Sequence, residues 1–142
     1  MAAIALDNEE GEAMDSDALR VLRRGWDAWV AQDVEGFLAL WDEDGTWTMP
    51  GRSKVSGTYT KGEIPAMIDI VFGTSNGTFV ATPTELASSD ETSAFGYFHM
   101  TAQRDGATID QDGLQRMTVR DGLITNLWNL WANQEEWDRF FS

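Results

Sequence analysis

The sequence lacks cysteine altogether and has a single histidine, His99, among its 142 residues. The absence of cysteine excludes disulfides, thiol nucleophiles and thiolate metal sites, and one histidine excludes a metal site built from several imidazoles. Long apolar runs are also missing, because no stretch approaches the roughly 20 residues that a membrane-spanning helix needs. We therefore expect a protein with no metal site and no membrane-spanning segment.

Basic residues are scarce as well. The chain has 10 Lys and Arg against 24 Asp and Glu, which gives a formal net charge of −14. A surface of this sign repels nucleic-acid phosphates and anionic lipids, so we expect no nucleic-acid partner and no membrane association. The N-terminus shows no basic region followed by an apolar stretch, as a signal peptide would, and we expect a cytoplasmic protein.

The sequence is rich in apolar and aromatic side chains. Hydrophobic residues make up 42% of the chain and include 7 Trp and 7 Phe, which can pack a core and also line a cavity. The exception is the acidic segment at the N-terminus, which has few large apolar groups. We expect residues 1–15 to form a disordered tail and residues 16–142 to form one domain.

The first half of the chain has the periodicity of helices. Apolar residues recur every three or four positions in three segments: Ser16–Gln32, a short stretch from Asp33 to Trp41, and Gly62–Phe72. A short strand over Thr46–Met49 and a loop through Ser56–Tyr59 are expected between the second and third helices.

The second half of the chain has the composition of strands. β-Branched and aromatic residues fill four segments between turn signals: Thr78–Ala87, Thr92–Gln103, Ala107–Val119 and Leu123–Ala132. Asn133 and Glu136 then form a capping-box pattern at the start of a last helix. This order indicates an α+β fold with helices on one face of an antiparallel sheet.

One hairpin can be worked out residue by residue. Asp105-Gly106 is typical of a two-residue turn, which pairs Arg104 with Ala107 and places His99 opposite Asp112. Side chains alternate along strands, so one face carries Tyr97, His99, Thr101, Asp110, Asp112, Leu114 and Arg116. Titratable groups beside aromatics suit a pocket, and we expect this face to point inward. The opposite face, with Phe98, Met100, Gln115 and Met117, would then meet a second subunit.

Several short motifs occur in a characteristic order. Phe37–Trp41 ends a helical stretch, Met49-Pro50-Gly51 follows, Ser56-Gly57 precedes a helix, and Val119–Thr125 leads into an aromatic strand before Trp137. Over roughly residues 18–141 this order resembles the nuclear transport factor 2-like superfamily, in its SnoaL-like and ketosteroid-isomerase-like branch. The resemblance implies a cone-shaped, cystatin-like fold, in which a curved antiparallel or mixed sheet wraps around N-terminal helices and a deep pocket. It also implies a homodimer and an apolar small-molecule ligand.

The pocket residues follow from the hairpin and from the resemblance. We expect His99 to act as a general acid and base, with Asp112 fixing its tautomer. Tyr97 or Asn129 would bind the reacting oxygen, and Asn129 is placed inward only by the resemblance. The expected substrate-binding residues are Trp47, Tyr59, Asp110, Leu114, Arg116, Leu127 and Trp131. We expect Trp26, Trp29, Trp41 and Trp137 to pack the core.

The expected function is a cyclase, isomerase or dehydratase that needs no cofactor and acts on an apolar polyketide- or terpenoid-like molecule in secondary metabolism, such as antibiotic biosynthesis. Met49 stands where ketosteroid isomerases carry their catalytic aspartate, which disfavours that reaction. Three alternatives stay open: a non-catalytic binder with the same pocket, an epoxide hydrolase or epoxide-opening cyclase, and an interaction module that uses the outer face of the sheet. In the binder, His99 would have only a structural role.

Overall fold

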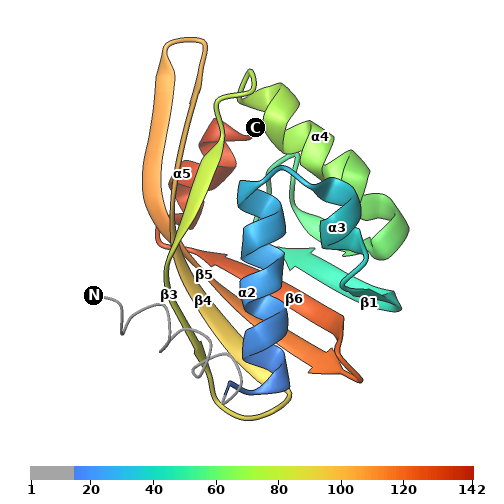
Figure 1. The fold of residues 1–142 in the computed structure, drawn as a ribbon. Helices are drawn as coiled ribbons and strands as arrows, with labels where there is room; N and C mark the ends of the chain where they lie inside the picture. Colours follow the sequence, from blue (N-terminus) through green and yellow to red (C-terminus); the bar gives the residue numbers. More distant parts are fainter. Residues whose placement is uncertain (1–14) are drawn as a thin grey trace.

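The computed structural model describes residues 15–142, which form helices packed against one curved sheet (Figure 1). The helices are α2 (Asp17–Val30), α3 (Val34–Leu38), the 3₁₀ turn η1 (Lys61–Glu63), α4 (Ile64–Thr74) and α5 (Gln134–Phe140). The strands are β1 (Trp41–Met49), β2 (Gly57–Thr60), β3 (Val80–Ser88), β4 (Ser93–Arg104), β5 (Ala107–Arg120) and β6 (Leu123–Trp131). The expected acidic tail, residues 1–15, lies outside the described residues except for Asp15.

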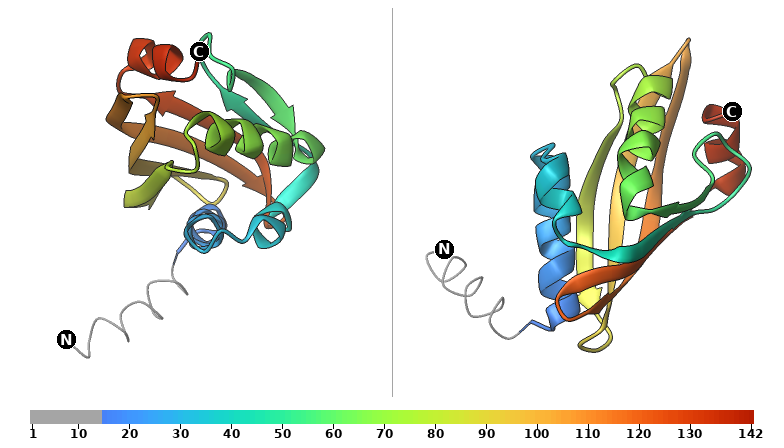
Figure 2. Two further views of the ribbon diagram at one scale, coloured as in Figure 1. Left: turned by 90° about the horizontal axis from the view of Figure 1, so that it is seen from above. Right: turned by 90° about the vertical axis from the view of Figure 1, so that its right-hand side faces the viewer.

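The six strands lie in the order β2-β1-β6-β5-β4-β3. Neighbouring strands are antiparallel except β1 and β6, which run parallel, so the sheet is mixed. Helices α2, α3 and α4 lie within the curve of the sheet, as the two views in Figure 2 show. The predicted cone-shaped α+β fold is confirmed. No helix within residues 15–142 is long and apolar enough to span a membrane.

The predicted β4–β5 hairpin is confirmed at every pair. Asp105 and Gly106 both have positive φ angles, 44° and 80°, as a type I′ two-residue turn requires. Arg104 then pairs with Ala107, and the register continues to His99 opposite Asp112. The turn chemistry therefore sets which side chains of the two strands share a face.

Two predicted boundaries near β1 were wrong. β1 begins at Trp41, which was expected to end a helix. Asp44-Gly45 lies inside this strand, where its pairing with β6 is irregular. A Cβ atom on Gly45 would lie 2.6 Å from the backbone oxygen of Ile124, so glycine permits this close approach. The loop expected over Ser56–Tyr59 is largely strand β2, Gly57–Thr60, whose mostly exposed side chains show no apolar alternation.

The start of α5 is fastened to the sheet. As predicted, the Asn133 side chain accepts a hydrogen bond from the backbone N–H of Glu136. The Asn133 backbone N–H donates instead to Gln111 Oε1 on β5, and Gln111 Nε2 donates to Glu136. A buried glutamine therefore completes the cap and holds α5 against the end of the sheet.

The inner face of the sheet is the opposite of the predicted one. Phe98, Met100 and Met117 are at most 2% exposed and form part of the core beneath the helices, whereas Tyr97 and Leu114 are 42% and 38% exposed. The register was right, but the face was assigned by the expectation that titratable groups line a pocket. Burying the large apolar side chains is favourable, and burying the ionic groups of the other face would carry a desolvation penalty.

Candidate functional site

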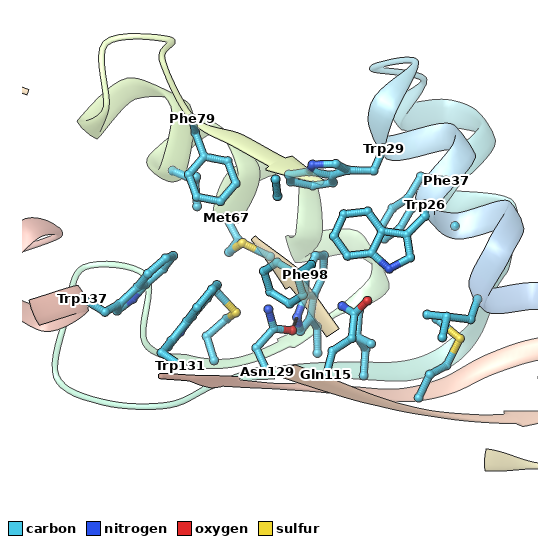
Figure 3. A pocket seen from close by; sticks show the side chains of 18 residues that line it. Trp26, Trp29, Phe37, Met67, Phe79, Phe98, Gln115, Asn129, Trp131 and Trp137 are labelled. Carbon is cyan, nitrogen blue, oxygen red and sulfur yellow. Dashed lines mark hydrogen bonds between the residues drawn. The ribbon is translucent and has the colours of Figure 1, made fainter. Parts of the chain in front are cut away.

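A cavity lies between the inner face of the sheet and the helices (Figure 3). Aromatic side chains form most of its wall: Trp26 and Trp29 from α2, Phe98 from β4, Trp131 from β6 and Trp137 from α5. About 50 Å³ of it can be reached by the centre of a water-sized sphere. In this conformation the cavity therefore has room for a few waters, since one water needs roughly 10–15 Å³ by this measure.

Ring-to-ring packing gives the cavity stiff walls. Trp131 and Trp137 stack with centroids 3.7 Å apart and planes 10° from parallel. Phe98 meets Trp131 edge-on at 5.6 Å and lies 5.2 Å from Trp26. Gly113, across from Phe98 on β5, makes room for this ring, because a Cβ there would lie 2.4 Å from Phe98 Cζ.

A second hollow adjoins the cavity between α2, α3 and α4. It offers about 330 Å³ to the centre of a water-sized sphere, and it shares Trp29 and Phe37 with the inner cavity. Trp29 is half-buried and packs against Phe37 at 6.3 Å and Phe72 at 6.1 Å. Trp29 and Phe37 therefore form part of the wall of both volumes.

The polar groups of the cavity are amides and indoles. Asn129 Oδ1 accepts a 2.8 Å hydrogen bond from Trp47 Nε1. Within residues 15–142, Gln115 Oε1 and the indole nitrogens of Trp26, Trp131 and Trp137 are buried without a hydrogen-bond partner. Each such group costs about 1–3 kcal/mol when it stays unpaired, so a ligand that pairs them would gain affinity.

Titratable side chains are absent from the cavity wall, as far as the described part of the chain goes. No Asp, Glu, His, Lys, Arg or Tyr from residues 15–142 lines it. The described residues also contain no group of three or more His, Asp or Glu side chains placed to hold a metal ion. The cavity can therefore bind and orient a molecule through shape and hydrogen bonds.

The predicted acid–base residues form a cluster on the outer face of the sheet. His99 Nδ1 lies 2.8 Å from Asp112 Oδ1, and His99 Nε2 lies 2.9 Å from Asp110 Oδ1. The Tyr97 hydroxyl donates to Asp112 Oδ2 at 2.8 Å. The predicted His99–Asp112 pairing is confirmed, but its predicted position inside the cavity was wrong.

The cluster shifts the pKa values of its own members. The hydrogen bond to Asp112 raises the pKa of His99, with a further contribution from the Asp110 charge, while partial desolvation opposes the rise. The same bond to His99 lowers the pKa of Asp112, helped by the Tyr97 hydroxyl. The hydrogen bond to Asp112 raises the pKa of Tyr97. The two carboxylates therefore favour the imidazolium form of His99.

The other predicted site residues divide between the two faces. Those that line the cavity are Trp47, Leu127, Asn129 and Trp131. Those on the outer face, besides the cluster, are Leu114 and Arg116. Tyr59 lies on β2, outside the cavity wall, and its hydroxyl donates to the backbone oxygen of Val55.

Sequence reasoning missed several residues of the cavity wall. Trp26, Trp29 and Trp137 were expected only to pack the core, and they both pack it and line the cavity. Phe98 and Gln115 were assigned to the outer face. The available signal was Gln115 itself, a polar residue on the same face of β5 as the apolar Met117. A polar side chain buried on an apolar face often has a function.

The sequence profile of the SnoaL-like domain matches residues 22–127. The chain belongs to the SnoaL-like domain family. No curated protein sequence matches this SnoaL-like chain. The family assignment agrees with the resemblance drawn from the motifs.

Solved structures share the fold of this SnoaL-like protein. Bal32a, from a soil-derived mobile gene cassette, superposes with a TM-score of 0.82 at 26% identity, covering 89% of this chain and 97% of Bal32a. TerC, co-crystallised with polyporic acid, gives 0.76 at 18% identity, covering 89% and 98%. RV0760c from Mycobacterium tuberculosis, in complex with estradiol-17β-hemisuccinate, gives 0.67 at 24% identity, covering 82% and 95%.

The pKa of His99 can be measured directly, because it is the only histidine of the chain. We expect NMR titration to give a value above the ordinary 6.5. Asp112→Asn should lower it more than Asp110→Asn does, because the hydrogen bond to Asp112 is the largest cause of the shift. A value at or below 6.5 in the wild-type protein would contradict this description of the cluster.

The same shifts fix how the cluster contributes to stability. A raised His99 pKa stabilises the fold fully below the unfolded value of 6.5, and this contribution is lost as the pH rises through the folded pKa. A lowered Asp112 pKa acts above the unfolded value of 3.8 and is lost as the pH falls through the folded pKa. Both contributions are present between pH 3.8 and pH 6.5, the two unfolded pKa values. His99→Gln should therefore lower the melting temperature most within this pH range and least near pH 9. A difference that grows toward pH 9 would show that the ion pair is not its cause.

Proposed function

We propose that this protein binds a neutral, oxygen-bearing ring compound in the aromatic cavity, and that it acts by binding rather than by acid–base catalysis. The observation that carries this proposal is the composition of the wall: aromatic and apolar side chains, two amides, and no titratable group from residues 15–142. Such pockets fix a ligand through shape and a few convergent polar groups.

The ligands of two fold neighbours support the proposal. TerC was co-crystallised with polyporic acid, and RV0760c was solved with estradiol-17β-hemisuccinate. Both ligands are ring systems with oxygen substituents, which supports the ring class of the proposed ligand. Both also carry an acidic group, so the neutral charge of the proposed ligand rests on the cavity wall alone. The ligand of this protein would enter through the adjoining hollow at α2, α3 and α4, with Trp29 or Phe37 moving to make room.

An enzyme remains the second candidate, and Asn129 is the group that favours it. Trp47 fixes the orientation of the Asn129 amide. A side chain that polarises a carbonyl or stabilises an enolate oxygen needs a fixed orientation of this kind. A cyclase that works by orienting a flexible substrate needs only this. An acid–base isomerase or dehydratase also needs a proton carrier at the cavity, and the predicted carrier, His99, lies on the outer face.

The binding proposal is tested by filling the cavity. Ala81 lines the cavity, and Ala87 is exposed on the same strand. We expect 1-tetralone to quench tryptophan fluorescence of the wild-type protein saturably. Ala81→Leu should weaken binding at least about tenfold because close-packed interiors have no room for both side chain and ligand.

Ala87→Leu is the matched control and should bind like the wild type. Melting curves of both variants would show that they fold. Unchanged binding in a folded Ala81→Leu protein would contradict the cavity as the binding site. Turnover of a ring-forming substrate, abolished by Asn129→Leu, would favour the enzyme instead.

We also propose that the protein is a homodimer through the outer face of the sheet. That face exposes Phe95, Tyr97, Leu114, Trp128 and Leu130, which the strand register places side by side. This is a different apolar set from the one predicted, which is buried inside. An exposed patch of this kind marks an interaction surface.

Charge placement on β5 favours a second copy of the chain as the partner. Leu114 lies between Arg116 on one side and Asp112 and Asp110 on the other, all on the outer face. A two-fold axis through Leu114 would set Arg116 of each copy against the acidic end of the other. The surface is therefore self-complementary.

Dimerisation is tested by placing a charge at the centre of this surface. We expect sedimentation equilibrium at micromolar concentration to show a dimer, and Leu114→Asp to shift it to monomer, because two carboxylates would face each other across the axis. Val30→Asp, at an exposed apolar residue on α2, should leave the dimer intact. A monomeric wild-type protein would overturn the proposal.

A further inference from the structure

Two amide side chains lie next to each other on the floor of the cavity. Gln115 on β5 and Asn129 on β6 are register partners, and such partners have Cβ atoms about 4.5–5.5 Å apart. Their exposed fractions are 6% and 4%. Figure 3 shows both side chains rising from the sheet into the ring of aromatic side chains. A ligand in the cavity would therefore meet both amides at once.

Asn129 presents a hydrogen-bond donor. An indole N–H can only donate, so the Asn129 atom bonded to Trp47 Nε1 must be the carbonyl oxygen Oδ1. This bond fixes the orientation of the amide without recourse to any other contact. The NH₂ group of Asn129 is what remains for a ligand, and it pairs with an acceptor such as a carbonyl oxygen.

Gln115 presents a hydrogen-bond acceptor. Its Oε1 atom is buried and, within the described part of the chain, has no hydrogen-bond partner. Gly96 on β4 is the register partner of Gln115, and a Cβ there would lie 2.8 Å from this oxygen. The amide of Gln115 therefore lies over Gly96, in space that any larger residue would fill. A ligand hydroxyl would supply the missing donor.

The charges around the cavity favour a neutral ligand. No Lys, Arg or His from residues 15–142 lines the cavity or the adjoining hollow, where Asp33 and Asp69 lie. An anion would lose its hydration without gaining a cationic partner. A cation would gain from the aromatic faces but would leave the buried Trp26, Trp131 and Trp137 donors without an acceptor.

We propose that the ligand is a neutral hydroxy-ketone on a ring system, whose carbonyl oxygen accepts from Asn129 Nδ2 and whose hydroxyl donates to Gln115 Oε1. This assignment of the ligand class rests on the proposed binding function of the cavity. The two amides then determine specificity, and the aromatic wall supplies most of the contact area. The indole donors favour further carbonyl or ether oxygens at the rim of the ring system.

The test compares three probes of similar size: tetralin, 1-tetralone and 4-hydroxy-1-tetralone. We expect affinity to rise in this order, by about fivefold for each added hydrogen bond. Gln115→Met should remove the advantage of the hydroxyl and leave 1-tetralone and tetralin unchanged. Asn129→Leu removes the donor and leaves the Trp47 N–H unpaired, so it should weaken both ketones and spare tetralin.

Two further variants separate recognition from packing. Gly96→Ala should displace the Gln115 amide and also abolish the advantage of the hydroxyl. Gln103→Met, at an exposed glutamine on β4, is the control and should bind all three probes like the wild type. Melting curves would establish that every variant is folded at the assay temperature.

Each outcome decides between distinct claims. If Gln115→Met weakens all three probes equally, Gln115 only packs and the ligand class is wrong, while binding in the cavity stands. If 1-naphthoate or phenyltrimethylammonium binds more tightly than 4-hydroxy-1-tetralone, the neutral class is wrong. If no probe binds the wild-type protein, the proposed binding function itself fails, and the ligand class fails with it.

Discussion

Side chains alternate across β4, β5 and β6, and this period of two determines which side chains line the cavity. One phase of the alternation carries Phe98, Gln115 and Asn129 into the cavity. The other phase carries Tyr97 and His99 to the outer surface. The turns at Asp105-Gly106 and Asp121-Gly122 hold neighbouring strands in register. A shift of one residue in this register would exchange the two sets of side chains.

The consequence is a separation of two kinds of chemistry. The charged and titratable groups lie on the outer face of the sheet, where they pair with one another, as His99 does with Asp110 and Asp112. The cavity wall holds uncharged polar groups that are buried and, among residues 15–142, partly unpaired: the amide oxygen of Gln115 and the indole N–H groups of Trp26, Trp131 and Trp137. Unpaired buried groups destabilise the unliganded protein. A close-packed core leaves few buried polar groups unpaired. Several unpaired groups around one cavity are therefore typical of a wall that binds a ligand.

The predicted and observed structures agree where local chemistry decides the outcome. Helix caps such as Asn133, the turn at Asp105-Gly106 and the pairing of His99 with Asp112 were all readable from the sequence. The inner face of the sheet was misassigned, because titratable side chains were expected to line a pocket and were given more weight than the large apolar side chains Phe98, Met100 and Met117, which are the ones buried. That single error placed the predicted catalytic group in the cavity instead of on the surface. Strand β2 was missed because its exposed residues carry no periodic signal.

The family assignment establishes the fold, whereas the chemistry of the protein depends on the side chains of its cavity. Members of a superfold share the scaffold and differ in the side chains that reach the cavity. In this protein those side chains include several indoles and the Gln115–Asn129 pair. The proposed recognition by hydrogen bonds uses the amides of Gln115 and Asn129 in this apolar wall, whereas acid–base catalysis would need a proton carrier that the described residues do not place there.

The most direct test of this account follows the indole N–H signals of the protein by NMR during titration with 4-hydroxy-1-tetralone. The account predicts large shifts for Trp26, Trp131 and Trp137, whose indoles line the cavity. It predicts no shift for Trp128, which is 48% exposed on the outer face, or for the imidazole of His99. Shifts at Trp128 and His99 with unchanged cavity indoles would place the binding site on the outer face and contradict the account.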